Sequence, residues 1–134
     1  MRRLVAAFLA GALALPVSAC APQRSDHMWQ VSQVYLNSAA TPTPPAPMYL
    51  VLGTSSFAGD TGCGPINGRL RTDEKEHTIT VVRVRTPDRL TCEGAAEFYN
   101  DEFLRFFTGT LHEERDGDEL TLRNDAGESI HMVY

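Results

Sequence analysis

The chain has 134 residues, of which 43% are hydrophobic and 22% charged, and its formal net charge is −5. This length favours one domain, because two domains would each fall near the lower size limit for a packed core. The balance of 12 basic against 17 acidic residues argues against a nucleic-acid partner, which selects basic patches, and no apolar run reaches the roughly 18 residues of a spanning helix.

Residues 1–19 have the layout of a secretory signal peptide. Arg2 and Arg3 precede a short apolar stretch, which is followed by small residues. The run Val17-Ser18-Ala19-Cys20 resembles the bacterial lipobox, and this resemblance implies a diacylglycerol and an amide-linked fatty acid on Cys20. More than one acyl chain gives durable anchoring. We expect a lipoprotein of the bacterial cell envelope, held on the cell membrane or the outer membrane with its domain outside the cytoplasm. The alternative is an ordinary secreted protein cleaved after Ala19.

Two cysteines, Cys63 and Cys92, remain once Cys20 is set aside. In an exported protein two such cysteines usually pair. Closing a loop of about 30 residues stabilises a fold by roughly 3.6 kcal/mol on the chain-entropy model. A redox-active pair is the alternative, but the spacing is not C-x-x-C. We predict a structural disulfide between Cys63 and Cys92.

The mature chain is expected to have a polar tether at residues 20–27 and a single domain at 28–134. Alternating apolar residues and turn signals predict strands at 28–36, 48–52, 56–58, 66–72, 78–85, 110–114, 120–123 and 129–134. The proline-rich segment 37–47 cannot be a paired strand. The densest turn chemistry lies at residues 59–65.

One helix is predicted at about residues 93–108. An apolar stripe at helical spacing runs along it: Ala96, Tyr99, Phe103, Phe106 and Phe107. Asp101 and Arg105 are placed for an i,i+4 ion pair, and Gly109 ends the helix. The expected fold is α+β and mostly antiparallel β, barrel-like or a strongly curved sheet, with one helix packed on it.

These elements resemble, in this order, the META domain family, which includes bacterial heat-shock proteins of the HslJ type. The resemblance covers about residues 28–134 and includes a helix with aromatic residues. Its short motifs are Trp29, Gly62-Cys63, Asn67-Gly68, Thr86, Thr91-Cys92, Asp116-Gly117 and Gly127. The family usually has asparagine directly after the first cysteine, whereas here Gly64 takes that place and Asn67 follows three residues later. The resemblance implies an envelope context rather than a reaction.

The sequence predicts no enzyme, metal site or cofactor. Its histidines, at 27, 77, 112 and 131, lack the spacing of a zinc-binding helix, and its serines lack the G-x-S-x-G nucleophile turn. Asp60 and Glu76 are candidates for a carboxylate pair. Solvated loop residues explain them better, because nothing in the sequence sets their separation.

The candidate binding loop is residues 59–68, with Asp60, Gly62, Gly64 and Asn67 as its site residues. Its backbone N–H groups could form an anion-binding nest; we favour the alternative, that the glycines let the chain turn beside the disulfide. The expected function is a non-enzymatic, membrane-anchored role in binding or stress tolerance, with an envelope protein as partner. The alternative is an inhibitor module that blocks a lysozyme or protease through this loop.

Overall fold

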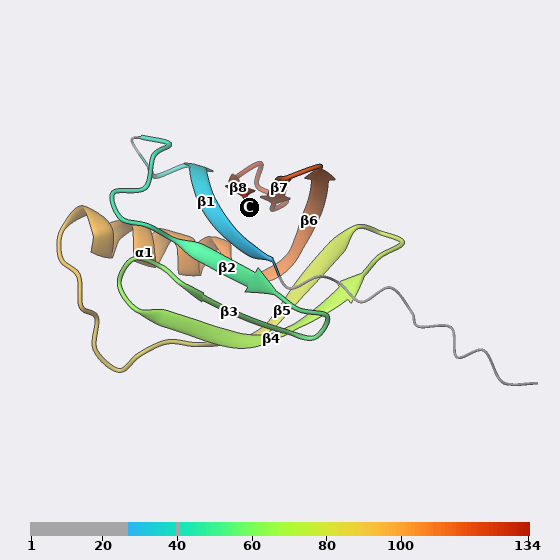
Figure 1. Ribbon diagram of the computed structural model, residues 1–134. Helices are drawn as coiled ribbons and strands as arrows, with labels where there is room; N and C mark the ends of the chain where they lie inside the picture. Colours follow the sequence, from blue (N-terminus) through green and yellow to red (C-terminus); the bar gives the residue numbers. More distant parts are fainter. Residues whose placement is uncertain (1–26, 40) are drawn as a thin grey trace, which may run out of the picture.

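Eight antiparallel strands form a closed barrel with one helix in the computed structural model, which describes residues 27–39 and 41–134 (Figure 1). The elements in chain order are β1 (Met28–Tyr35), β2 (Tyr49–Leu52), β3 (Ser56–Asp60), β4 (Pro65–Asp73), β5 (Thr78–Arg85), α1 (Ala95–Phe106), β6 (Gly109–Asp116), β7 (Glu119–Arg123) and β8 (Ser129–Val133). Each strand pairs with the next, and β1 pairs with β8. The predicted α+β fold is confirmed, in its barrel form. The predicted signal peptide and Cys20 lie outside the described residues.

The strands alternate because one face of each is buried inside the barrel. Along β7, Leu120 and Leu122 are fully buried, while the flanking Glu119 and Arg123 are exposed. The other strands supply apolar side chains to the same interior, and the described core is continuous. The interior is therefore filled by side chains, as expected for a barrel of eight strands.

Two bulges break this alternation. In β1 the register shifts between Val31 and Gln33, so that Val31 and Val34 are both buried, although three positions in the sequence separate them. In β5, Val81 pairs with Leu70 and Arg83 pairs with Arg69. Val82 between them is therefore the extra residue of a bulge, and it is 54% exposed. An unbroken strand would place Arg83 on the same face as Ile79 and Val81; the bulge instead moves the side chains after Val82 to the opposite face, so that Arg83 is exposed.

The helix α1 buries the aromatic stripe that the sequence predicts. Tyr99, Phe103 and Phe106 are buried, and Phe107 follows directly with its ring stacked on Phe103 at 5.4 Å between centroids. Phe107 also meets Phe57 of β3 edge-on at 5.0 Å. These rings join the helix to the core of the barrel. The helix is too short and too polar to cross a membrane, and no other helix occurs in the described residues.

The proline-rich segment after β1 is not a strand, as predicted, and it packs against α1. The Tyr99 hydroxyl donates to the backbone carbonyl of Thr41 at 2.6 Å. The backbone N–H of Val34 donates to the carbonyl of Pro42 at 2.7 Å. The segment thus covers the edge of β1 where its pairing with β2 has ended.

The barrel has two different ends. The end we call the tether end holds the start of β1, the turns at 74–77 and 117–118, and the C-terminal Tyr134. The His27 ring, where the described chain begins, stacks on the Tyr134 ring there at 4.1 Å between centroids. The opposite helix end holds the turn between β3 and β4, the β7–β8 turn and α1.

Candidate functional site

Cys63 and Cys92 form a disulfide, the pairing predicted from the sequence, with their Cα atoms 4.9 Å apart. Cys63 is fully buried in the turn between β3 and β4, and Cys92 lies just before α1. Thr91 strengthens this junction, because its backbone N–H and its hydroxyl both donate to the carbonyl of Cys63, at 3.1 and 3.0 Å. The disulfide therefore fixes the β3–β4 turn to the segment that leads into the helix.

The segment expected to be a loop, residues 59–68, is largely strand. Gly59 lies in β3, Gly68 lies in β4, and the turn is limited to residues 61–64. A Cβ on Gly59 would lie 2.2 Å from the carbonyl oxygen of Tyr49, and a Cβ on Gly68 would lie 1.8 Å from that of Arg83. These two glycines permit close strand approach rather than a turn, which corrects the extent of the candidate loop.

The four predicted loop residues separate into two groups. Asp60 closes the short turn, since its carboxylate accepts the backbone N–H of Gly62 at 2.7 Å. Gly62 and Gly64 have φ angles of 83° and 145°, which favour glycine. Asn67 belongs instead to β4, where it is exposed and pairs with Ala58 on one side and Arg85 on the other. The structure brings together the first three residues but not Asn67.

The carboxylates of Asp60 and Glu76 do not face each other. Asp60 lies at the helix end and Glu76 in the turn at the tether end, so the length of β4 separates them. The nine residues of β4 extend over roughly 30 Å at the usual rise of a strand. A two-carboxylate site made from this pair is therefore excluded.

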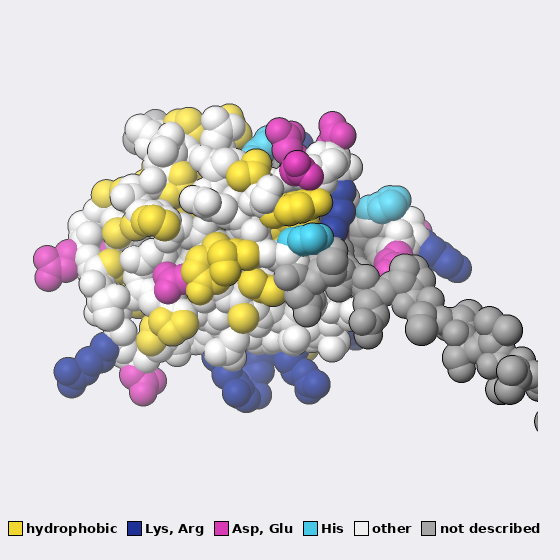
Figure 2. Space-filling view, viewed as in Figure 1, with side chains coloured by type: hydrophobic (Ala, Val, Ile, Leu, Met, Phe, Trp, Pro, Cys, Tyr) yellow, Lys and Arg dark blue, Asp and Glu magenta, His cyan; other side chains and the backbone are white. Residues whose placement is uncertain are grey.

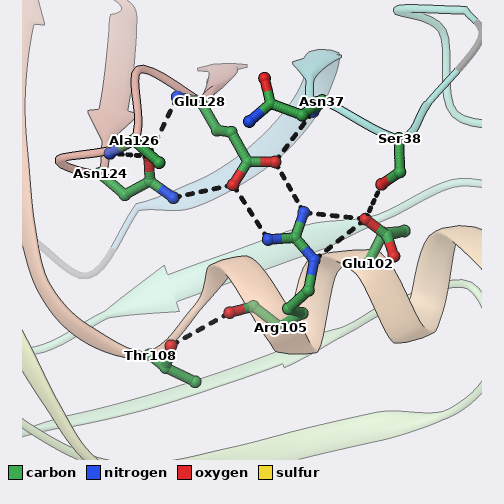
Figure 3. A network of polar contacts seen from close by, with 8 residues as sticks. All are labelled: Asn37, Ser38, Glu102, Arg105, Thr108, Asn124, Ala126 and Glu128. Atoms are coloured by element: carbon green, nitrogen blue, oxygen red, sulfur yellow. Dashed lines mark hydrogen bonds and ion pairs between the residues drawn. The ribbon is translucent and has the colours of Figure 1, made fainter.

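A buried polar network at the helix end was not predicted (Figure 3). Glu128, in the β7–β8 turn, is only 1% exposed. Arg105 donates to both of its carboxylate oxygens, at 3.0 and 2.6 Å. Asn37 donates its backbone N–H at 2.9 Å, and Asn124 its side-chain amide at 3.0 Å. The carboxylate thus connects α1, the segment after β1 and the last turn of the barrel.

These contacts change the acid–base behaviour of the network. The hydrogen bonds from Arg105 lower the pKa of Glu128 from 4.5 to about 2, and the pKa of Arg105 is raised in turn. Arg105 also donates to Glu102 at 2.8 Å, which lowers the pKa of that carboxyl. The predicted ion pair between Arg105 and Asp101 is wrong, because the guanidinium turns toward Glu128 and Glu102 instead. We assign the network a structural role.

An aromatic cluster marks the tether end. Trp29 is 1% exposed, and its indole N–H has no hydrogen-bond partner among the described residues. The ring of Tyr134 meets Trp29 edge-on at 4.7 Å between centroids, and the guanidinium carbon of Arg115 lies 5.2 Å from the indole centroid. Because His27 stacks on Tyr134, the cluster holds the beginning and the end of the domain together.

Beside this cluster is a surface hollow of about 620 Å³, between the β4–β5 turn and β6. It is lined by Thr72, Asp73, Glu74, His77, Glu113, Glu114 and Arg115. Arg115 is paired with Glu113, Nε to Oε1, at 2.5 Å, so the remaining carboxylates make the hollow acidic. Such a lining suits a cationic group. In the part of the chain that the structure describes, no three or more His, Cys, Asp or Glu side chains are arranged so that they could hold a metal ion.

The barrel, its disulfide and its single helix define a small cross-linked β-barrel domain with an acidic hollow at one end. The model of the META domain family matches residues 22–133, and the chain belongs to the META domain family. The resemblance seen in the sequence is thereby confirmed.

Solved structures share this fold. A protein from Burkholderia xenovorans, determined by NMR, has a TM-score of 0.65 and 16% identity, with 93% of this chain and 97% of the other covered. A crystal structure of a DUF4847 family protein from Bacteroides vulgatus has a TM-score of 0.57 and 16% identity, with 81% and 92% covered. At such identities the likeness shows the fold alone. No curated protein matches the sequence.

Proposed function

We propose that this META-domain protein is a lipid-anchored, non-enzymatic binding protein of the bacterial cell envelope, with a role in envelope maintenance or stress tolerance. The disulfide between Cys63 and Cys92 is the observation that carries the proposal. Disulfides persist in oxidising compartments and are rare in the cytosol. The cross-link therefore supports export, which agrees with a signal peptide at residues 1–19 followed by Cys20.

The distance between anchor and domain is short. Six residues, 21–26, separate Cys20 from His27, and an extended chain reaches at most about 3.6 Å per residue, so the tether spans at most about 25 Å. His27 is itself held against Tyr134. An acylated Cys20 would keep the tether end of the barrel close to the membrane surface.

Binding is assigned to the outside of the barrel. The interior is filled by buried apolar side chains, whereas the acidic hollow beside β6 is open to solvent. Asp73, Glu74 and Glu114 present carboxylates there, and a basic segment of an envelope protein is the partner that this charge favours. The inhibitor alternative required a protruding loop at residues 59–68. Because that segment is mostly strand, we do not pursue it.

The anchor is tested by the full chain carrying Cys20→Ala, followed by separation of membrane and soluble fractions. We expect the variant to leave the membrane fraction and the natural chain to remain in it. Cys92→Ala is the matched control, because it removes a cysteine and the disulfide but leaves the lipidation site. Membrane association that survives Cys20→Ala contradicts the anchor.

The partner is tested by crosslinking in intact cells. A photoreactive residue at position 74, in the hollow, should capture an envelope protein, while the same residue at position 123 on β7 should not. Equal capture at both positions, or capture at neither, contradicts the assignment of the hollow.

A further inference from the structure

Four arginines gather on the outer face of β4 and β5. Arg69 and Arg83 are direct partners across the two strands, Arg71 pairs with Thr80, and Arg85 pairs with Asn67. All four side chains are exposed. We call these four residues, Arg69, Arg71, Arg83 and Arg85, the arginine face. In Figure 2, Lys and Arg side chains project from the lower edge of the molecule, where β4 runs in Figure 1.

The arginine face lacks a counter-charge among the residues that the structure describes. Within residues 27–39 and 41–134, none of its guanidinium groups forms an ion pair with a carboxylate. Like charges directly opposite on neighbouring strands destabilise a sheet, and Arg69 faces Arg83 in this way. The face also stands out in a chain whose formal net charge is −5. An external anionic surface would relieve this repulsion.

The opposite charge is concentrated at the tether end. The two turn regions at 73–77 and 116–119 contain six carboxylates and one lysine: Asp73, Glu74, Glu76, Asp116, Asp118 and Glu119, with Lys75. Acidic side chains are visible near the end of β6 in Figure 2. The barrel therefore has an acidic end and a basic side, and a negatively charged surface would repel the first and attract the second.

We propose that the arginine face docks on anionic phospholipid headgroups of the membrane that carries the anchor, so that the barrel lies on its β4–β5 side. This inference rests on the proposed lipid anchor at Cys20. A tether of at most about 25 Å holds the domain at the surface, and its acidic end cannot face an anionic bilayer without repulsion. When the basic β4–β5 side faces the membrane, the domain stays within reach of its anchor and its acidic end does not face the bilayer.

Arginine is suited to this contact. Its planar guanidinium binds phosphate with two parallel hydrogen bonds and is less strongly hydrated than an ammonium group. Each basic residue close to an anionic membrane contributes about a fivefold factor in binding. That contribution falls when salt shortens the screening length from about 8 Å at physiological ionic strength to about 3 Å at 1 M. The tether supplies the high effective concentration that such weak contacts require.

The test uses the full mature lipoprotein in vesicles of phosphatidylcholine, with or without phosphatidylglycerol. Arginines are modified with phenylglyoxal and quantified by mass spectrometry. We expect slower modification of the arginine face only in the vesicles with phosphatidylglycerol, and recovery at about 1 M salt. Arg123, an exposed residue on β7, is the internal control and should react equally in both kinds of vesicle.

A double variant sharpens this experiment. Arg69→Gln with Arg83→Gln should lower the ratio of docked to undocked protein about 25-fold, and Arg71 and Arg85 should lose their protection. The matched control, Lys75→Gln with Arg123→Gln, removes two charges outside the arginine face and should leave protection unchanged.

The outcomes separate the anchor from the docking face. A chain that stays on both kinds of vesicle but shows equal arginine modification overturns the docking face and leaves the anchor intact. A chain that leaves phosphatidylcholine vesicles overturns the anchor, and this inference with it. Protection that appears in native membranes but not in protein-free anionic vesicles assigns the face to an acidic protein and also overturns the proposal.

Discussion

Arg105 and Glu128 form a bidentate ion pair that joins the helix to the last turn of the barrel, with donor–acceptor distances of 3.0 and 2.6 Å. They lie 23 residues apart in the chain, and the carboxylate is 1% exposed. Two further donors, from Asn37 and Asn124, complete its hydrogen bonding. The pair therefore sits where three separate segments of the fold must be correctly placed.

Glu128→Gln should destabilise the protein by about 2 kcal/mol at neutral pH. Breaking a fully buried pair costs more, about 3 to 5 kcal/mol, but the Arg105 side chain is 48% exposed and water can solvate it. Urea denaturation gives the free energy of unfolding. Glu102→Gln is the matched control: it also removes a carboxylate from Arg105, at a more exposed position, and should cost under about 1 kcal/mol. Equal losses in the two variants would contradict this account.

The Glu128 carboxylate also makes the free energy of unfolding depend on pH. Its folded pKa is about 2, below the ordinary value of 4.5, so its contribution is present above about pH 4.5 and is lost as the pH falls toward 2. We expect this contribution to be about 2 to 3 kcal/mol. The stability difference between the natural chain and Glu128→Gln should therefore shrink across this range. A difference that stays constant from pH 6 to pH 2 contradicts the prediction.

Reduction of the disulfide should lower the free energy of unfolding by about 3.6 kcal/mol, because it closes a loop with a sequence separation of 29. Urea denaturation with and without dithiothreitol measures this loss. Cys92→Ala, at the less buried of the two positions, should behave like the reduced protein and show no further response to reductant. A natural chain that is insensitive to reductant contradicts the structural role of the cross-link.

Gly68→Ala should destabilise the barrel by more than about 3 kcal/mol, because the added Cβ would lie 1.8 Å from the carbonyl oxygen of Arg83. Gly117→Ala is the control. Gly117 has a φ of 58°, but a Cβ there would meet nothing within 4 Å. We expect it to cost about 1 to 2 kcal/mol from backbone strain alone. Similar melting temperatures for the two variants would contradict the role given to Gly68.

Trp29→Phe should cost about 1 kcal/mol or less. The substitution removes volume, but it also removes an indole N–H that is buried without a partner among the described residues. Trp29→Ala, which opens a large cavity, should cost about 3 to 5 kcal/mol. Because Trp29 is the single tryptophan of the chain, circular dichroism rather than fluorescence should follow the unfolding of both variants. A cost for phenylalanine close to that for alanine contradicts the prediction.

Much of the fold follows from local patterns. The alternation of leucines in β7 and the aromatic spacing in α1 each identify one element, because these periods reflect which face is buried. The bulge in β1 has a trace in the sequence, because the spacing of apolar residues changes between Val31 and Val34. The bulge in β5 is not visible, since every neighbour of Val82 is compatible with an unbroken strand. It becomes evident only when β4 is paired with β5, because Arg69 and Leu70 then lie opposite Arg83 and Val81.

The candidate site was less predictable. The motif Gly62-Cys63-Gly64 does mark a turn. In the sequence, Gly59 and Gly68 cannot be distinguished from these turn glycines, but they lie in strands and allow close strand packing. Their role depends on Tyr49 and Arg83, which local sequence does not place beside them. Glu128 likewise gives no local signal of burial, because a glutamate after Gly127 is typical of an exposed turn.

The sequence by itself determined the order and type of the elements, the pairing of Cys63 with Cys92, and the lipobox-like run that ends at Cys20. Each of these depends on residues that are close together in the sequence or on the small number of cysteines. Tertiary structure alone decided that the sheet closes, that Arg105 selects Glu128 rather than Asp101, and that Arg69 faces Arg83. These relationships join residues from different elements, and strand register and packing of the whole barrel set their distances.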